Sequence, residues 1–256
     1  MEVHAHSHSP RKKFTHYLWD FLMLFLAVFC GFLAENFREH KVEQIRAHEY
    51  AESMVLDLQN DTAAIHLEDK SAVLYNSLVD SLLIINKSKL EGRNASKFSF
   101  YSRFLYWTLP ISWNRTTFEQ IKNSGSLRYF KNNDLLKKLM KYEAKVNEIL
   151  AESNAHGERG NLMLVRINSI IDPLFHQLAS RYFLWSINTI SNQTRDSIFS
   201  IPLASLENKR PEINEMLNMA VVQQRNLRYS NETRWRQAEE LARELITDLK
   251  KEYHLE

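Results

Sequence analysis

Histidines near the N-terminus are the first residues of this chain whose type and spacing could do chemistry. His4, His6 and His8 alternate along the sequence, so an extended tail could bring three imidazoles together. Neutral imidazole binds Zn²⁺ and Cu²⁺ readily, but no cysteine accompanies these residues to complete a closed site. We favour a polar tail that holds no metal, with a metal site at these three histidines as the alternative.

A second histidine belongs to the segment His48-Glu49-Tyr50-Ala51-Glu52, which is one residue short of a zinc-protease pattern. That pattern needs another histidine one helical turn after the first, and Glu52 stands there instead. We therefore interpret the segment as the polar face of a helix. The chain also has no Gly-rich phosphate loop and no Gly-x-Ser-x-Gly motif, so we predict that it is not an enzyme and needs no cofactor.

Asp20 is the most unusual single residue, because it interrupts the most apolar part of the chain. Phe21 to Ala34 carries no charge, and an ionisable group in a membrane span is costly and usually faces protein or water. Two interpretations are open. Asp20 either rests at the lipid headgroups beside Lys12, Lys13 and His16 with no special role, or it contacts a partner or carries a proton within the membrane.

The apolar segment determines where the protein resides. Residues 14–36 are about as long as a bilayer-crossing helix, which needs roughly 20 residues. A cleaved signal peptide is the alternative, but Ala34 has Phe32 where a small residue is needed for cleavage. A buried core helix would be less apolar around its whole circumference. We predict an uncleaved transmembrane anchor.

The charges beside this segment indicate its orientation. Arg11, Lys12 and Lys13 form a tight basic cluster before it, and lysine and arginine favour the cytoplasmic side. We predict a single-pass protein of the bacterial inner membrane. Residues 1–13 would form a cytoplasmic tail, and residues 37–256 an exported domain in the periplasm.

Composition limits what the exported domain can be. The net charge of +2 gives no basic excess, so we expect no nucleic-acid partner. Cys30 is the only cysteine, which excludes a disulfide or a cysteine-based metal site in the domain. Only five glycines and five prolines occur in 256 residues, and long stretches without them favour long helices.

Two of these stretches carry a near-heptad apolar seam. The first, within a long helix at about 37–90, includes Leu58, Ile65 and Leu82. The second, within a long helix at about 211–254, includes Leu241 and Leu245. Each seam needs a partner to bury its apolar side chains, so we predict that Ala51–Ile85 packs against Ile213–Tyr253, either within one chain or between chains. The predicted fold is all-α, with a transmembrane helix that continues into a long rod and an elongated antiparallel helical bundle or coiled coil.

The middle of the chain has shorter elements. We predict helices at about 116–183, with a capping box at Thr116 and Glu119, a cap at Asn133 or Asp134, an end at Gly125 and a restart at Pro173. We predict irregular structure at 92–97 and 98–107, a break at 157–160 and a surface loop at about 191–210.

Two segments resemble a known family. One runs from Leu18-Trp19-Asp20-Phe21 to Glu35-Asn36-Phe37-Arg38-Glu39; the other is Thr117-Phe118-Glu119-Gln120-Ile121-Lys122-Asn123-Ser124-Gly125-Ser126-Leu127, followed by Lys131-Asn132-Asn133-Asp134-Leu135. They are similar to an uncharacterised single-span membrane protein family common in Bacteroidota. The resemblance implies an N-terminal anchor and a helical exported domain, and adds no chemistry. The chain departs from it in the histidine tail, in Phe37 where a tryptophan is usual, and after Arg181.

These features predict a non-catalytic interaction or scaffold protein of the cell envelope. Its partners would be the lipid bilayer and a protein, in a membrane complex or a homo-oligomer. One alternative is an accessory or stator-like subunit of an ion-driven inner-membrane complex, with Asp20 as the functional carboxylate. Another is a metal or ligand sensor that uses the histidine tail.

Overall fold

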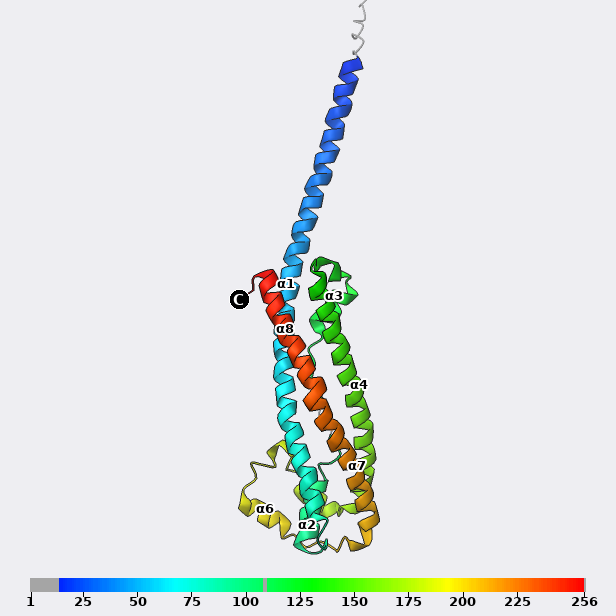
Figure 1. Cartoon of the computed structure of the whole chain (residues 1–256), viewed down its shortest axis with the longest axis vertical. Coiled ribbons are helices and arrows are strands. Elements are labelled where there is room, and N and C mark those ends of the chain that lie inside the picture. Colours follow the sequence, from blue (N-terminus) through cyan, green and yellow to red (C-terminus); the bar gives the residue numbers. More distant parts are fainter. Residues whose placement is uncertain (1–13, 108–109, 256) are drawn as a thin grey trace, which may run out of the picture. The chain divides into compact units, whose positions relative to one another are not determined.

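The computed structural model describes residues 14–107 and 110–255, and these are helical with no strand. The all-α prediction is confirmed. The chain divides into two compact units, the first ending at Tyr50 and the second beginning at Ala51. This boundary lies 14 residues after the predicted end of the anchor at Asn36. Figure 1 shows the elements in chain order.

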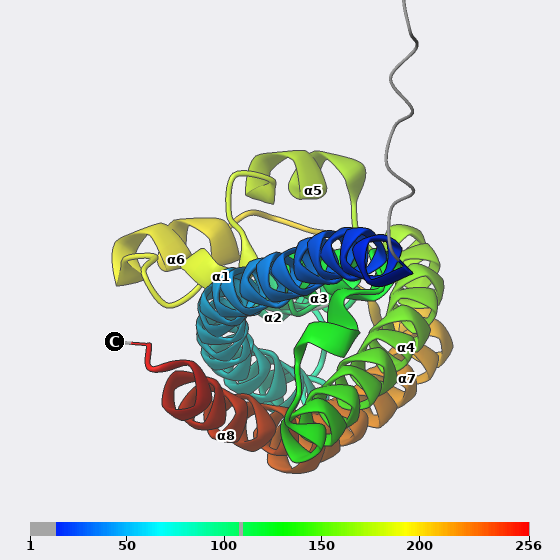
Figure 2. The same ribbon diagram turned by 90° about the horizontal axis from the view of Figure 1, so that it is seen from above.

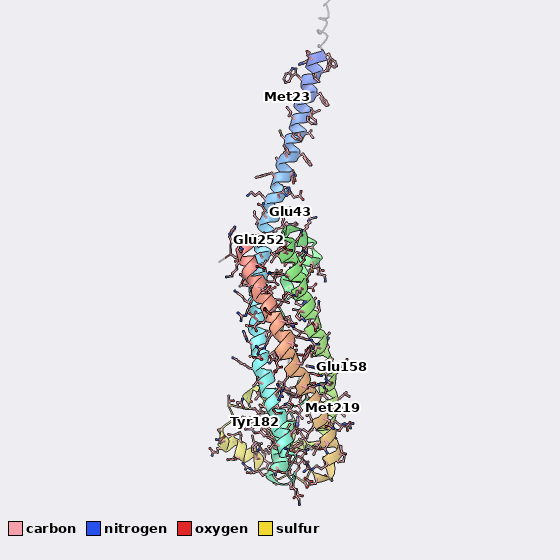
Figure 3. The ribbon with its side chains drawn as sticks, in the orientation of Figure 1. Met23, Glu43, Glu158, Tyr182, Met219 and Glu252 are labelled. Carbon is pink, nitrogen blue, oxygen red and sulfur yellow. The ribbon has the colours of Figure 1, made fainter. Side chains whose placement is uncertain are left out.

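The first described element, α1, runs from Phe14 to Ile85 and contributes to both units. Its apolar part is exposed on every side; Leu24, Val28 and Phe32, for example, each have about two-thirds of their surface accessible. Figure 3 shows side chains of this part, Met23 among them, projecting away from the helix. The segment is long and apolar enough to cross a membrane, and none of it is buried. It is therefore a candidate membrane span.

The second unit is a bundle whose sides are the later part of α1, the helix α4 (Asn133–Ile170) and a C-terminal helical run (Figure 2). That run consists of α7 (Arg210–Tyr229), a π-helical turn (Ser230–Trp235) and α8 (Arg236–Tyr253). Gln224 donates to the carbonyl of Asn76 at 2.9 Å, and His66 lies 3.2 Å from Glu239. These pairings run in opposite directions along the two helices. The predicted packing of Ala51–Ile85 against Ile213–Tyr253 is thus confirmed.

The predicted seam residues lie in the core of this unit. None of them has more than 8% of its surface exposed: Leu58, Ile65, Leu82, Leu241 and Leu245. Burial of a leucine or isoleucine contributes about 1.5–3 kcal/mol relative to an exposed side chain. The bundle therefore depends on the two seams that the sequence identifies.

Short helices connect the long ones. They are α2 (Arg93–Ser102), α3 (Thr116–Asn123), α5 (Pro173–Ala179) and α6 (Asn192–Phe199), with 3₁₀ turns at Ser126–Tyr129, Leu184–Ser186 and Glu207–Lys209. The restart at Pro173 is confirmed, with Asp172 as its N-cap. Gly125 has φ of 70° and follows α3, as predicted.

Two predicted irregular regions each contain a short helix, so those predictions were wrong in part, whereas residues 103–107 and 200–206 are non-helical as predicted. Residues 93–102 form α2, because Phe98 and Phe100 bury their rings and fix the segment. The predicted loop at 191–210 contains α6, which begins at Asn192 and is capped by Ser191, whose hydroxyl oxygen accepts from the amide of Thr194. The two helices pack together, with the rings of Phe100 and Phe199 5.8 Å apart. The polar composition of this segment gave no indication of α6, which the contact between Phe199 and Phe100 holds against α2.

Three helix-boundary predictions also need correction. The first long helix ends at Ile85, short of residue 90. No break occurs at 157–160, and α4 continues through both glycines. Each glycine costs the helix about 1 kcal/mol, which tertiary packing offsets. Asn132 caps α4 one residue earlier than expected.

The capping box at Thr116 does not form either. Thr116 is already the first residue of α3, and no local side chain caps that helix. The carboxylate of Asp57 in α1 accepts from the amide of Thr117 at 3.2 Å instead. A group distant in the sequence therefore replaces the local cap.

Candidate functional site

The π-helical turn Ser230–Trp235 is the most unusual backbone feature of the second unit. Such turns are rare and often mark functional sites. In an ideal α-helix, residues five apart point in directions about 140° different. Here both Ser230 and Trp235 are buried, with 1% and 4% exposure. The wider turn lets both side chains face the interior.

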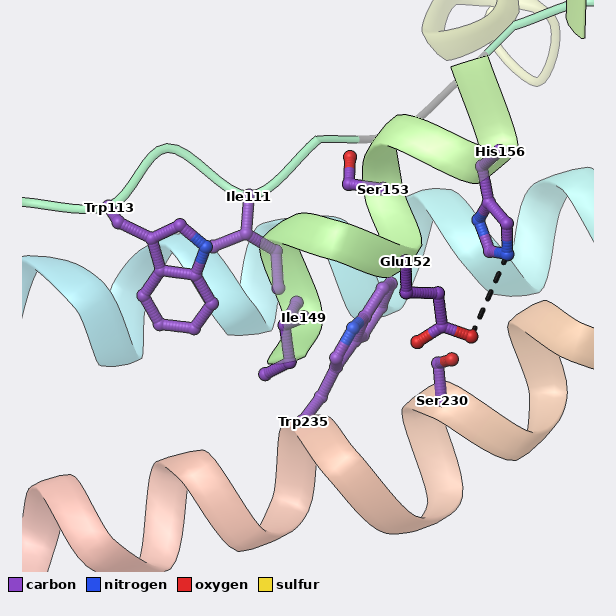
Figure 4. Close-up of a pocket in the computed structure, with 8 residues that line it drawn as sticks. All are labelled: Ile111, Trp113, Ile149, Glu152, Ser153, His156, Ser230 and Trp235. Carbon is purple, nitrogen blue, oxygen red and sulfur yellow. Dashed lines mark ion pairs between the residues drawn. The ribbon is translucent and has the colours of Figure 1, made fainter. Parts of the chain in front are cut away.

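These two residues line a small, partly open cavity of about 10 Å³ (Figure 4). The other walls come from α4 and from the extended segment before α3: Ile149, Glu152, Ser153, His156, Ile111 and Trp113. This volume corresponds to roughly one water molecule. The cavity is therefore too small for an organic substrate.

Three polar groups at the cavity have no hydrogen-bond partner among the described residues. They are Nε2 of His156, Oγ of Ser230 and Nε1 of Trp113. The nearest charged contact is Glu152 Oε1, 3.7 Å from His156 Nε2, as the dashed line in Figure 4 shows. A buried polar atom without a partner costs about 1–3 kcal/mol. The site has the size and the donors and acceptors to hold one water molecule.

The surroundings of His156 favour the neutral form of its imidazole. Its side chain is buried, and burial lowers its pKa below the usual value of 6.5. The positive charges of Arg159 and Arg234 lower this pKa further, and only Glu152 opposes them. A neutral imidazole can both donate and accept a hydrogen bond, which suits a water-sized cavity.

Glu152 connects the cavity to the surface. Its Oε1 atom lies 2.9 Å from Nη1 of Arg234, a residue of the π-helical turn. Nε of Arg234 also donates to Glu148 at 2.7 Å, and Glu148 pairs with Lys145 at 2.5 Å. Hydrogen bonds from Lys145 and then from Arg234 lower the pKa of Glu148. The turn is thus held in place by a chain of ion pairs along α4.

A second buried polar cluster fixes the extended segment that forms one wall of the cavity. Asp61 of α1 accepts from the hydroxyl of Tyr142 at 2.6 Å and from the amide of Asn114 at 2.7 Å. Arg115 pairs with Glu143 of α4 at 2.7 Å. Burial raises the pKa of both Asp61 and Glu143, although these hydrogen bonds act in the opposite direction. We interpret the cluster as structural, because it ties α1, α4 and the segment at 110–115 together.

Glu68 of α1 is a half-buried carboxylate that forms no ion pair with the described residues. Its Oε2 atom is buried without a hydrogen-bond partner among the described residues, and burial raises its pKa from 4.5 to about 7. An acid with a raised pKa binds its proton more tightly in the folded state. Its contribution to stability is therefore present below pH 4.5 and is lost as the pH rises through 7.

We therefore expect Glu68→Gln to stabilise the protein at pH 8 and to change little at pH 4.5. The neutral amide removes the cost of a buried charge, which we expect to be about 1–2 kcal/mol after allowance for partial solvent access. Chemical denaturation at the two pH values measures the difference. Glu52→Gln, at an exposed position of the same helix, is the control. An equal effect of Glu68→Gln at both pH values would contradict the assignment.

The residues singled out in the sequence do not come together at this site. His4, His6 and His8 lie outside the described residues. Asp20 is exposed in α1, 4.0 Å from His16. His48, Glu49 and Glu52 are exposed. Within 14–107 and 110–255, no group of three histidine, cysteine or acidic side chains could hold a metal ion.

The cavity residues were missed because they come from three distant parts of the chain. One signal was present: Ile149, Glu152, His156 and Gly160 follow each other at helical spacing of three or four residues. This spacing places His156 on the inner face of α4. Comparisons of the chain with protein-family models, curated proteins and solved structures give no match.

Proposed function

We propose that this chain is a membrane-anchored, non-catalytic interaction protein of the bacterial cell envelope, whose helical domain binds a protein partner. The observation that carries the proposal is the apolar part of α1, whose large side chains are exposed on all sides. A lipid environment would remove this surface from water, which is worth roughly 25 cal/mol per Å². A signal sequence would also be a long apolar segment near the N-terminus. The unsuitable cleavage site beside Ala34 favours an anchor instead.

The interaction role is supported by what the second unit offers. Its core is filled by the two seams, and the small cavity has space only for a water-sized molecule. Its larger depressions are open surface grooves lined by charged side chains. Such a domain can present surfaces to another protein. Purification from native membranes in mild detergent, followed by mass spectrometry, tests for that partner; recovery of the chain as a lone monomer would contradict the proposal.

The basic cluster Arg11–Lys13 favours a cytoplasmic N-terminus and an exported second unit. We expect a reporter enzyme that is active only in the periplasm to be active when fused after Glu256. The same reporter fused after Lys13 should be inactive, and this fusion is the control. The protein should also remain in membranes after an alkaline wash. A cytoplasmic reporter that is active at Glu256 would contradict the orientation.

A further inference from the structure

A surface groove of about 460 Å³ lies on the outer side of the π-helical turn. It lies between α4 and the C-terminal helical run, and its lining includes Glu152, Ala155, Arg159, Arg225, Asn226, Tyr229 and Arg234. Three arginines face one carboxylate there, which gives a net charge of +2 (three minus one). The groove is therefore basic in a chain whose charges nearly balance.

A second groove on the same unit provides a comparison. It is of similar size, about 560 Å³, and is lined by Lys138, Arg236, Arg243, Thr247 and four acids, Glu239, Glu240, Glu244 and Asp248. Three cations against four carboxylates give a net charge of −1. The arginine excess is thus a local property of the first groove.

Two guanidinium groups in the basic groove have no acidic partner within residues 14–107 and 110–255. Nε of Arg159 makes only a long hydrogen bond, 3.4 Å, to Gln223. Nη2 of Arg225 makes a contact of 3.5 Å with Asn226. Among the described residues, no carboxylate lies within 4.0 Å of either arginine. Arg234, in contrast, is already held by Glu148 and Glu152.

We propose that this groove binds a phosphate dianion, either free or as a monoester. Arg159 on α4 and Arg225 on α7 come from opposite sides of the groove, and each offers a planar fork of N–H donors. A carboxylate has two oxygens, which one fork can saturate, whereas a tetrahedral phosphate has oxygens for both forks. Asn226 and Tyr229 also line the groove, and their side chains carry polar groups.

Glu152 is expected to oppose phosphate binding, whereas the arginines favour it. It is the only acid among the described residues that line the groove, so it repels an incoming anion and competes for Arg234. Removing its charge should strengthen phosphate binding, whereas removing an arginine should weaken it. A general loss of structure would weaken binding in both cases.

The test is isothermal titration of the full-length protein in detergent at pH 7.5, with chloride keeping the ionic strength constant. The probes are inorganic phosphate and phenyl phosphate. We expect saturable binding at one site, weakened roughly tenfold or more by Arg159→Gln and by Arg225→Gln. Tighter binding of phenyl phosphate would identify a monoester as the ligand, and equal or weaker binding would identify free phosphate.

Two matched variants are the controls. Arg166→Gln removes an arginine of α4 that is paired with Glu215, and Arg236→Gln removes one from the other groove. Both should bind like the parent, and Glu152→Gln should bind more tightly. Circular dichroism checks that each variant is folded. Absence of saturable binding, equal affinity in the arginine variants, or no gain in Glu152→Gln would overturn the proposal.

Discussion

Leu58→Asp is expected to destabilise the second unit by on the order of 3–5 kcal/mol, which is the lost apolar burial plus the cost of burying a carboxylate. Leu58 has 2% of its surface exposed in the seam of α1. Asp57 and Asp61 flank this position, so a third carboxylate also adds repulsion. We expect the midpoint of unfolding to fall sharply.

The control lies two residues earlier on the same helix. Leu56 has 56% exposure, and Leu56→Asp should change stability by only a few tenths of a kcal/mol, as surface substitutions usually do. Both variants make the same chemical change in the same helix, so differences in helix propensity cancel. Urea denaturation in detergent, followed by tryptophan fluorescence, reports on the five tryptophans of the chain, of which Trp235 lies in the bundle core. Equal midpoints for the two variants would show that Leu58 does not belong to the core.

The pairing of α1 with the C-terminal run could be predicted because it depends on local periodicity. An apolar side chain every three or four residues defines a helix face, and a face without a partner is unstable in water. The spacing of Leu58 and Leu241 was therefore enough to predict that both are buried. The π-helical turn could not be predicted in this way, since Ser230–Trp235 contains no residue type that requires an extra residue in the turn.

Prediction of the short helices and of the site would have required knowledge of contacts between residues that are distant in the sequence. At the start of α3, the amide of Thr117 donates to the carboxylate of Asp57, which lies 60 residues earlier in the chain. The cavity forms where Trp113, His156 and Ser230 converge from three segments. Local motifs such as the histidines of the tail can suggest a metal site, but they carry no information about which buried polar groups will meet.

Arg115→Met is expected to destabilise the protein by about 3 kcal/mol at pH 7.5, the lower end of the loss when a buried ion pair loses one member. Glu143 has 6% exposure, and Arg115 is its partner at 2.7 Å. Without the guanidinium, Glu143 keeps the cost of burial and the repulsion from Glu119 and Asp61 that already raise its pKa. The pKa of Glu143 should therefore rise further in the variant.

The pH dependence of this loss has a definite sign. A raised pKa means that the folded state gains stability when Glu143 is protonated, so the deficit of the variant should be smaller at pH 5 than at pH 7.5. The double variant Arg115→Met with Glu143→Leu removes both charges and should recover most of the loss, because apolar side chains can replace a buried ion pair at little cost.

Glu119, the other partner of Arg115 at 3.2 Å, is 40% exposed and can be solvated by water. Denaturation of the parent, the single variant and the double variant at both pH values measures these differences. A deficit in the single variant that is independent of pH, or a double variant no more stable than the single one, would show that Arg115 stabilises the bundle by packing rather than by its charge.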